Sequence, residues 1–282
     1  MAAALVLHTR LGHTARKPEM LLKNKVAVIY GAGGAVGSAV ARAFAREGAR
    51  LFLTGRHRAP VEAIAKEGVS AEGTAETAEV DALDEQAIDR HLQSVVDKAG
   101  RVDISFNAIG IPNTALQGIP LVELDIAQFS LPIATYTKSY FLTARLAARR
   151  MVAKRSGVIM TVTSIPSRTA IPLMGGVAPA MSAVEALTRD LSAELAPQGI
   201  RVVGLRPQGM PESDTIKEVF GLHAKAWGVS REQFQEMIAS RTHMRRLTTL
   251  EEMANVAAFM ASDQASAMTG TVVNLSLGSL DD

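Results

Sequence analysis

The sequence predicts an α/β protein with one doubly wound domain, in which helices cover both faces of a seven-stranded parallel sheet. From Lys25 onward, short apolar runs alternate with longer segments of helical period, which is the pattern of strand–helix–strand units. A glycine-rich turn directly follows the first apolar run. The chain has 282 residues, which is long enough for one large domain and short for two with separate cores.

Seven apolar runs are expected to be the strands, and they span residues 26–30, 50–54, 77–80, 102–106, 157–163, 201–205 and 271–275. The segments between them have helical spacing. One of these segments places apolar residues three and four positions apart, on a single helix face, at Val184, Leu187, Leu191 and Leu195. We expect this helix to end at 197–199, where a proline and a glycine let the chain enter the next strand.

Residues 1–21 are expected to form a mobile N-terminal extension, and residues 22–282 the folded domain. The short apolar run at 2–7 is followed by positive charge rather than preceded by it, so it does not match a secretory signal. No later window has the length of a membrane span, so we expect a cytoplasmic protein with no membrane partner. From 207 to 246, aromatic residues alternate with charges and no strand fits. We expect a helical flap over a ligand there, or alternatively a helical excursion packed for its own sake.

Charge and residue types exclude several functions. The 30 basic and 28 acidic side chains are scattered along the chain and leave a net charge of +2, so nucleic acid is not an expected partner. The absence of cysteine excludes disulfides, thiolate catalysis and cysteine-based metal sites. His57, His91, His223 and His243 show no metal-ligand spacing and lie among polar neighbours, so we expect surface positions and no metal site.

The first strand runs into the segment Gly31-Ala32-Gly33-Gly34-Ala35-Val36-Gly37, and a helix-forming segment follows. Glycines at such a turn let the backbone approach a pyrophosphate, whose charge is stabilised by free N–H groups at the helix N-terminus. Because a strand and a helix flank the turn, the sequence predicts a dinucleotide site made by Gly31, Gly33, Gly34, Ala35, Val36 and Gly37. The alternative is a purely structural turn.

The end of the second strand indicates which dinucleotide is bound. A site for NAD usually places an acidic side chain there for the ribose 2′-OH, whereas a 2′-phosphate favours cations. This chain has Arg56 and Arg58 and no acid, which favours NADP(H) over NAD(H), unless both arginines are ordinary solvated residues. Asp81, after the third strand, is placed either to accept a hydrogen bond from the adenine amino group or to cap the helix that begins near Asp84.

Polar and glycine residues recur at the ends of the later strands. Asn107-Ala108-Ile109-Gly110 ends the fourth, Thr163-Ser164 the fifth, and Pro207-Gln208-Gly209 the sixth. Together with the glycine turn and Asp81, these segments make the chain similar to the short-chain dehydrogenase/reductase family over about residues 22–278. The resemblance implies a Rossmann-type fold and an oxidoreductase that uses NAD(P) on a small-molecule substrate. It also implies that Asn107, Gly110, Pro207 and Gly209 lie beside the cofactor.

The resemblance fails at the catalytic positions. In the family, a Tyr-x-x-x-Lys on the helix after the fifth strand supplies the proton and binds the ribose. Here Val177 and Met181 occupy these two positions. Tyr136 occupies the place of the family's asparagine, with Thr135 and Thr137 as alternatives, and only Ser164 is retained. The glycine motif also differs, since Tyr30 and Ala35 replace a threonine and a glycine.

Two functions from different classes follow. In the first, the protein is still an oxidoreductase, with Tyr136 as the candidate proton donor beside Ser164; the alternative for Tyr136 is a core or interface aromatic. In the second, the protein is a non-catalytic homologue that holds a cofactor or an apolar ligand without turnover, because apolar residues surround the former reaction centre. Family members form dimers or tetramers, so we also expect a homo-oligomer that packs through segments 128–152 and 178–196, which carry many small residues.

Overall fold

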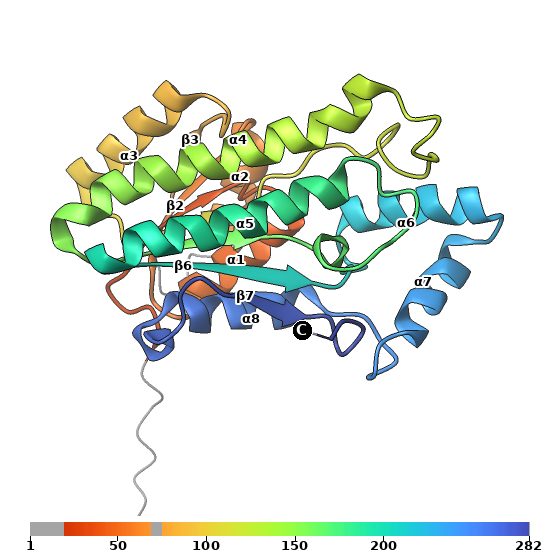
Figure 1. The fold of residues 1–282 in the computed structure, drawn as a ribbon. Coiled ribbons are helices and arrows are strands. Elements are labelled where there is room, and N and C mark those ends of the chain that lie inside the picture. The colour runs from red at the N-terminus through yellow and green to blue at the C-terminus, as the bar shows by residue number, and fades with distance from the viewer. Residues whose placement is uncertain (1–19, 69–74, 282) are drawn as a thin grey trace, which may run out of the picture.

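The computed structural model describes residues 20–68 and 75–281, and these residues confirm the predicted fold class. One seven-stranded sheet has the order β3-β2-β1-β4-β5-β6-β7, and every adjacent pair is parallel (Figure 1). The strands are β1 (Val26–Tyr30), β2 (Arg50–Gly55), β3 (Ala75–Glu79), β4 (Ile104–Asn107), β5 (Gly157–Val162), β6 (Ile200–Pro207) and β7 (Val272–Leu275). All seven predicted runs are therefore strands, with ends that differ by up to two residues.

Helices connect the successive strands, as the crossover connections of a parallel sheet require. They are α1 (Ala35–Arg46), α2 (Arg58–Gly68), α3 (Glu85–Ala99), α4 (Ile126–Met151), α5 (Val177–Leu195), α6 (Asp214–Trp227), α7 (Arg231–Ser240) and α8 (Leu250–Ala261). The strand order reverses between β1 and β4. In open α/β sheets, ligands bind beside such a reversal, outside the carboxyl ends of the strands.

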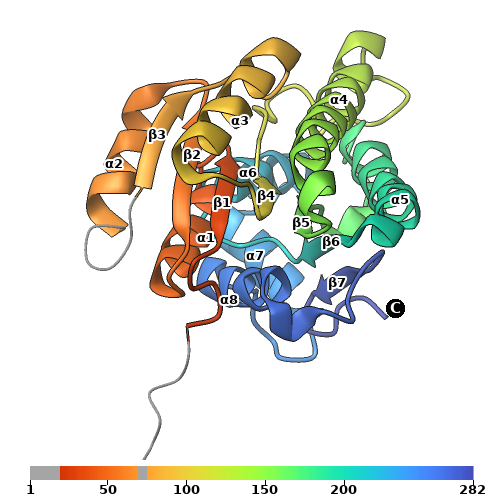
Figure 2. The same ribbon diagram turned by 90° about the vertical axis from the view of Figure 1, so that its left-hand side faces the viewer.

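Two hydrophobic cores lie on the two faces of the sheet (Figure 2). Alternate residues of β1 belong to different cores. Ala27 and Ile29 pack on the side of α1, α2 and α8, whereas Val28 and Tyr30 pack on the side of α3, α4 and α5. This follows from the period of two along a strand, which sends successive side chains to opposite faces. The apolar content of β1, β2 and β4 is thus explained by burial on both sides, whereas β3 at the edge of the sheet is polar and only half-buried.

Segment 207–246 begins at the last residue of β6 and beyond it contains α6 and α7 and no further strand, as predicted. The two helices pack on each other through a small core of their own, in which the rings of Phe220 and Phe234 meet edge to face at 5.5 Å. In Figure 1 they lie at the end of the sheet where the strands terminate, beyond the arrowhead of β6. They therefore occupy the position expected of a flap over that edge.

The N-terminal boundary of the folded domain lies slightly earlier than residue 22. Leu22 is fully buried, and the backbone N–H of Leu21 donates to Glu47 Oε2 at 2.9 Å. Residues 1–19 lie outside the described residues, so the extension predicted there stays a prediction.

The surface positions expected for two histidines are wrong. His223 on α6 is 2% exposed, and the ring of His91 on α3 contacts Phe52 edge to face. The Nδ1 atom of His91 is buried without a hydrogen bond to the described residues. Both errors have one cause: polar sequence neighbours on a helix face outward while the histidine itself faces inward.

Candidate active site

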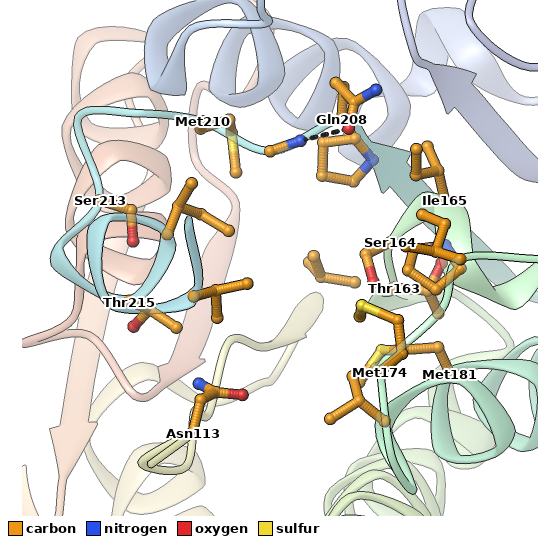
Figure 3. Close-up of a pocket in the computed structure, with 18 of the residues that line it drawn as sticks. Asn113, Thr163, Ser164, Ile165, Met174, Met181, Gln208, Met210, Ser213 and Thr215 are labelled. Atoms are coloured by element: carbon orange, nitrogen blue, oxygen red, sulfur yellow. Dashed lines mark hydrogen bonds between the residues drawn. The ribbon is translucent and has the colours of Figure 1, made fainter. Parts of the chain in front are cut away.

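A pocket of about 400 Å³ opens at the carboxyl ends of the strands, beside the reversal between β1 and β4. Segments far apart in the sequence line it: the glycine turn, the end of β4 with the loop that follows, α4, the end of β5 with the start of α5, the end of β6, the flap helices, and Ser279 after β7. Figure 3 shows Ser164, Met174 and Met181 on one side of this pocket and Ser213 and Thr215 on the other. The pocket thus joins the predicted nucleotide site to the predicted flap.

The glycine turn has the geometry that its sequence requires. Gly31 has φ +72°, and a Cβ there would lie 2.6 Å from the carbonyl oxygen of Ala108. A Cβ on Gly37 would lie 2.3 Å from the carbonyl oxygen of Gly31, so the turn packs directly against the first turn of α1. Gly33 faces Pro60 rather than the pocket. These three glycines therefore shape the turn, and a side chain at any of them would displace backbone or ring atoms.

The N-terminus of α1 opens on the pocket. Gly34 is its N-cap, no side chain caps it, and its first turn has no acidic residue. Gly34, Ala35 and Val36 all line the pocket. The free N–H groups and the positive end of the helix dipole are consequently available to an anion. Ala35 adds one methyl group where the family has a glycine.

Tyr30, which replaces the family's threonine, points away from this turn. Its ring is fully buried in the core on the α3–α4 face, and its hydroxyl has no hydrogen-bond partner among the described residues. Burial raises the pKa of this phenol above its ordinary value, with the charge of Arg150 acting in the opposite direction. Tyr30 therefore takes no part in the pocket.

The structure places the three residues expected at the adenosine end outside the pocket lining. Arg58 begins α2 and its guanidinium pairs with Glu62, whereas the exposed Arg56 makes no hydrogen bond or ion pair with a described residue. The Oδ1 atom of Asp81 accepts a hydrogen bond from the N–H of Leu83, and the cap of α3 is Asp84. The alternative that Asp81 caps this helix is therefore wrong.

The end of β4 is held by its side chains. The Asn107 amide donates to the hydroxyls of Ser139 and Thr143 on α4, and its oxygen accepts from the N–H of Ile109. The Tyr140 hydroxyl bridges the carbonyl oxygens of Asn107 and Val162. Asn107 is 2% exposed and supports the strand end from behind, while Gly110 lines the pocket.

Ser164 lies at the end of β5 with its hydroxyl toward the pocket and no hydrogen bond to a described residue. Behind it, the carboxylate of Glu185 on α5 accepts hydrogen bonds from Thr163 and Ser167 and pairs with Arg206 on β6 at 2.7 Å. Both members of this ion pair are nearly inaccessible, at 2% for Glu185 and 3% for Arg206. Although burial acts in the opposite direction, these hydrogen bonds hold the pKa of Glu185 below its ordinary value.

Tyr136, Val177 and Met181 form one apolar cluster with Tyr140, Ala180 and Val184. Val177 is the first residue of α5, 7% exposed, and Met181 follows one turn later, 5% exposed. Both line the pocket, as does Tyr136, so the positions expected to be adjacent are brought together. Lys138, two residues after Tyr136 on α4, is exposed.

Burial raises the pKa of Tyr136 to about 12, and a backbone hydrogen bond with Ile111 acts in the opposite direction. No cationic side chain belongs to this cluster. The phenol therefore stays protonated at neutral pH and can donate a proton but cannot accept one there.

Several lining residues were not predicted. The end of β6 contributes Pro207 and Gly209, as expected, and the close approach of Phe220 to Gly209 explains why a glycine stands there. Polar residues of the loop after β4 and of α6 also line the pocket: Asn113, Gln117 and His223. Gln117 joins the other two, through bonds of 2.6 Å to Asn113 and 3.2 Å to His223. Their spacing in the chain carries no motif that could have indicated this contact.

The described residues contain no group of three His, Asp or Glu side chains that could hold a metal ion. In the same part of the chain, no helix combines the length and the apolar content needed to cross a bilayer.

Comparison with known proteins defines the family. A family model described as enoyl-(acyl carrier protein) reductase matches residues 31–279. The uncharacterized oxidoreductase YxbG of Bacillus subtilis (strain 168) is 32% identical over 253 residues, which cover 88% of each chain. The 3-oxoacyl-[acyl-carrier-protein] reductase FabG of Thermotoga maritima is 28% identical over 259 residues, covering 92% of this chain and 99% of that protein.

Among solved structures, NAD+-bound xylitol dehydrogenase matches with a TM-score of 0.84 and 26% sequence identity, over 92% of this chain and 99% of that chain. The chain therefore belongs to the short-chain dehydrogenase/reductase family of oxidoreductases. The expected resemblance is confirmed at this level.

Proposed function

We propose that the protein is an NADP(H)-dependent oxidoreductase that acts on a small, partly apolar molecule through a non-standard site. One observation carries this proposal: the uncapped N-terminus of α1 and the free hydroxyl of Ser164 face the same pocket. The first is suited to a pyrophosphate and the second to a carbonyl or hydroxyl of a substrate.

The residues present fit a dinucleotide. Gly34, Ala35 and Val36 offer backbone N–H groups to the pyrophosphate, and Gly110, Pro207 and Gly209 line the space further along the pocket. When bound, the nicotinamide would supply the hydride. The chain's own contribution is to hold the dinucleotide at these backbone positions and to present Ser164 to the substrate.

The preference for NADP(H) rests on Arg56. This exposed guanidinium follows β2 and has no partner among the described residues, so no ion pair has to be broken before it contacts a 2′-phosphate. Arg58 is a weaker candidate because Glu62 already pairs with it. Asp81, which is exposed after β3, retains the second carboxylate oxygen for an adenine amino group.

Tyr136 is the proposed proton donor. It lines the pocket, contacts the positions of the missing tyrosine and lysine, and is protonated at neutral pH. Since Val177 and Met181 carry no titratable group, they can only shape the pocket and exclude water. The site is thus suited to reduction, which consumes a proton, better than to oxidation, which needs a base.

Calorimetric titration of the purified protein with NADPH and NADH tests this proposal first. We expect NADPH to bind more tightly than NADH, and Arg56→Ala to weaken NADPH roughly tenfold while leaving NADH unchanged, because one guanidinium–phosphate contact is lost. Arg58→Ala is the matched control and should have a smaller effect. Failure of both nucleotides to bind would contradict the proposal.

A second function, favoured by the apolar cluster at the catalytic positions, is ligand binding without turnover. Val177 and Met181 remove the groups that would stabilise developing charge on a substrate oxygen. A protein of this kind would bind NADPH or an apolar ligand and would show no consumption of NADPH with any member of a panel of ketones, aldehydes and enones. Consumption with one panel member would exclude this second function.

We also propose that the protein is a homo-oligomer that packs through α4 and α5. Helix α4 carries three large apolar side chains at the surface, which are Ile126, Leu131 and Phe141. Covering such side chains is favourable and a second copy would do so. A monomeric mass by light scattering at micromolar concentration would contradict this proposal.

A further inference from the structure

One face of α7 lines the flap side of the pocket. Phe234, Ile238 and Arg241 are all lining residues, and they are four and then three positions apart. This spacing puts them on the same side of a helix. The face changes along the helix from aromatic to aliphatic to cationic, with Arg241 immediately after the last helical residue, Ser240.

Helix α6 completes the apolar wall of this half of the pocket. Ile216, Val219 and Phe220 line it from α6, and the Phe220 ring packs against Phe234 of α7. The buried amides nearby are already bonded, since Gln117 is joined to both Asn113 and His223. A ligand here therefore meets mainly hydrocarbon.

Arg241 is the single formally charged side chain among the described residues that line the pocket, which include no Asp, Glu or Lys. His223 does not add a second charge, because burial lowers its pKa. The ordinary role of an arginine at this position is to bind the last carbonyl groups of its helix. Instead, the exposed Arg241 guanidinium makes no hydrogen bond or ion pair with any residue in the described part of the chain.

We propose that the flap half of the pocket binds an apolar molecule that carries an anionic group, and that Arg241 pairs with this anion. A guanidinium binds carboxylate, sulfonate or phosphate oxygens through two parallel N–H donors. The walls from α6 and α7 would cover the apolar body of the ligand. The inference that this molecule is the substrate rests on the proposed function. The inference that an apolar anion binds beside Arg241 does not.

Two fluorescent probes with the same aromatic skeleton test this inference. They are 8-anilinonaphthalene-1-sulfonate, which is anionic, and N-phenyl-1-naphthylamine, which lacks the sulfonate. Each is titrated into the full-length protein and into Arg241→Gln and Arg231→Gln, and each is also used to displace the other. Arg231 is the matched control because it lies at the other end of α7, pairs with Glu232 and does not line the pocket.

We expect the two probes to compete and the sulfonate probe to bind more tightly. Arg241→Gln should weaken the sulfonate probe roughly fivefold, a modest factor because the side chain is partly solvated, and leave the neutral probe unchanged. Arg231→Gln should change neither. Equal effects of Arg241→Gln on both probes, no effect on either, or the same loss in Arg231→Gln would overturn the proposal.

Titration with NADPH separates this inference from the proposed function. We expect both probes to bind in the presence of saturating NADPH and Arg241→Gln to leave the affinity for NADPH unchanged. Displacement of both probes by NADPH, or a loss of NADPH affinity in Arg241→Gln equal to the loss for the sulfonate probe, would assign Arg241 to the nucleotide and overturn the inference. Failure of NADPH to bind would overturn the proposed function alone.

Discussion

Removal of the Tyr136 hydroxyl tests the non-standard chemistry most directly. Tyr136→Phe keeps the ring that packs on Val177 and Met181 and deletes the single group proposed to donate a proton. A positioned general acid contributes roughly 10²- to 10⁴-fold to a rate, so we expect a loss in that range. Because the ring and its packing are kept, the free energy of unfolding should change by no more than about 1 kcal/mol.

The pH dependence provides an independent check. Because the pKa of Tyr136 is raised to about 12, the phenol remains a proton donor throughout the neutral range and beyond it. The rate of carbonyl reduction by the wild type should therefore be flat between about pH 7 and pH 10, as followed by NADPH absorbance with a substrate found in the carbonyl panel. Retention of most activity in Tyr136→Phe, or a rate that falls as the pH rises through neutrality, would refute the assignment.

Tyr30→Phe is the matched control for the tyrosine substitution. It also deletes a buried hydroxyl, but one that lies outside the pocket and has no partner among the described residues. We expect unchanged turnover. The free energy of unfolding should stay the same or rise slightly, since the variant has no hydroxyl there that loses its hydrogen bonds to water when the chain folds.

Three further predictions concern stability, each measured by denaturant unfolding. Burial lowers the pKa of His91 from 6.5 to about 4, so the unfolded chain binds a proton in this range that the folded protein does not. The wild type should therefore lose up to about 3 kcal/mol of the free energy of unfolding as the pH falls from 6.5 to 4. The control His57→Gln, which changes an exposed histidine, should lose the same amount, whereas His91→Leu should not. Glu185→Ala removes the carboxylate that binds the buried Arg206 guanidinium and two hydroxyls, and it should lower the free energy of unfolding by about 3 kcal/mol. A loss below about 1 kcal/mol would show that this ion pair contributes little to stability. Gly31→Ala combines φ +72° with a carbonyl oxygen at 2.6 Å and should cost at least about 2 kcal/mol, whereas Gly221→Ala, with nothing within 4 Å of its Cβ, should be neutral or slightly stabilising.

The strands, the helices and the glycine turn could be predicted from the sequence because each depends on local pattern. Apolar runs of strand length, such as Val26–Tyr30, are specified by burial on both faces, whichever elements cover them. The assignment of Val177 and Met181 to the family's tyrosine and lysine positions came from the resemblance and stays a prediction, although both residues line the pocket together with Ser164. The resemblance also led to the expectation that Tyr136 lies beside them, and the three side chains share one apolar cluster.

Contacts between distant segments could not be predicted in this way. The Glu185–Arg206 ion pair joins α5 to β6, and its members show no motif that relates them. His223 reads as a surface residue from its polar neighbours, yet the packing of α6 turns it inward against Gln117. Such pairs depend on which faces of two helices or strands meet, and that depends on the packing of the whole domain rather than on any window of sequence.

The sequence by itself determined the doubly wound fold and the glycine turn at Gly31–Gly37, because periodicity and spacing are properties of a single chain segment. Only the tertiary structure decided what shares the pocket with that turn. It brought the Phe234–Arg241 face of α7 into the same pocket as the glycine turn and left Arg241 as the one formal charge among the described lining residues. The physical reason is that a pocket forms where separate elements converge, and the angle at which α6 and α7 return over the sheet is set by their packing against each other and against the strand ends.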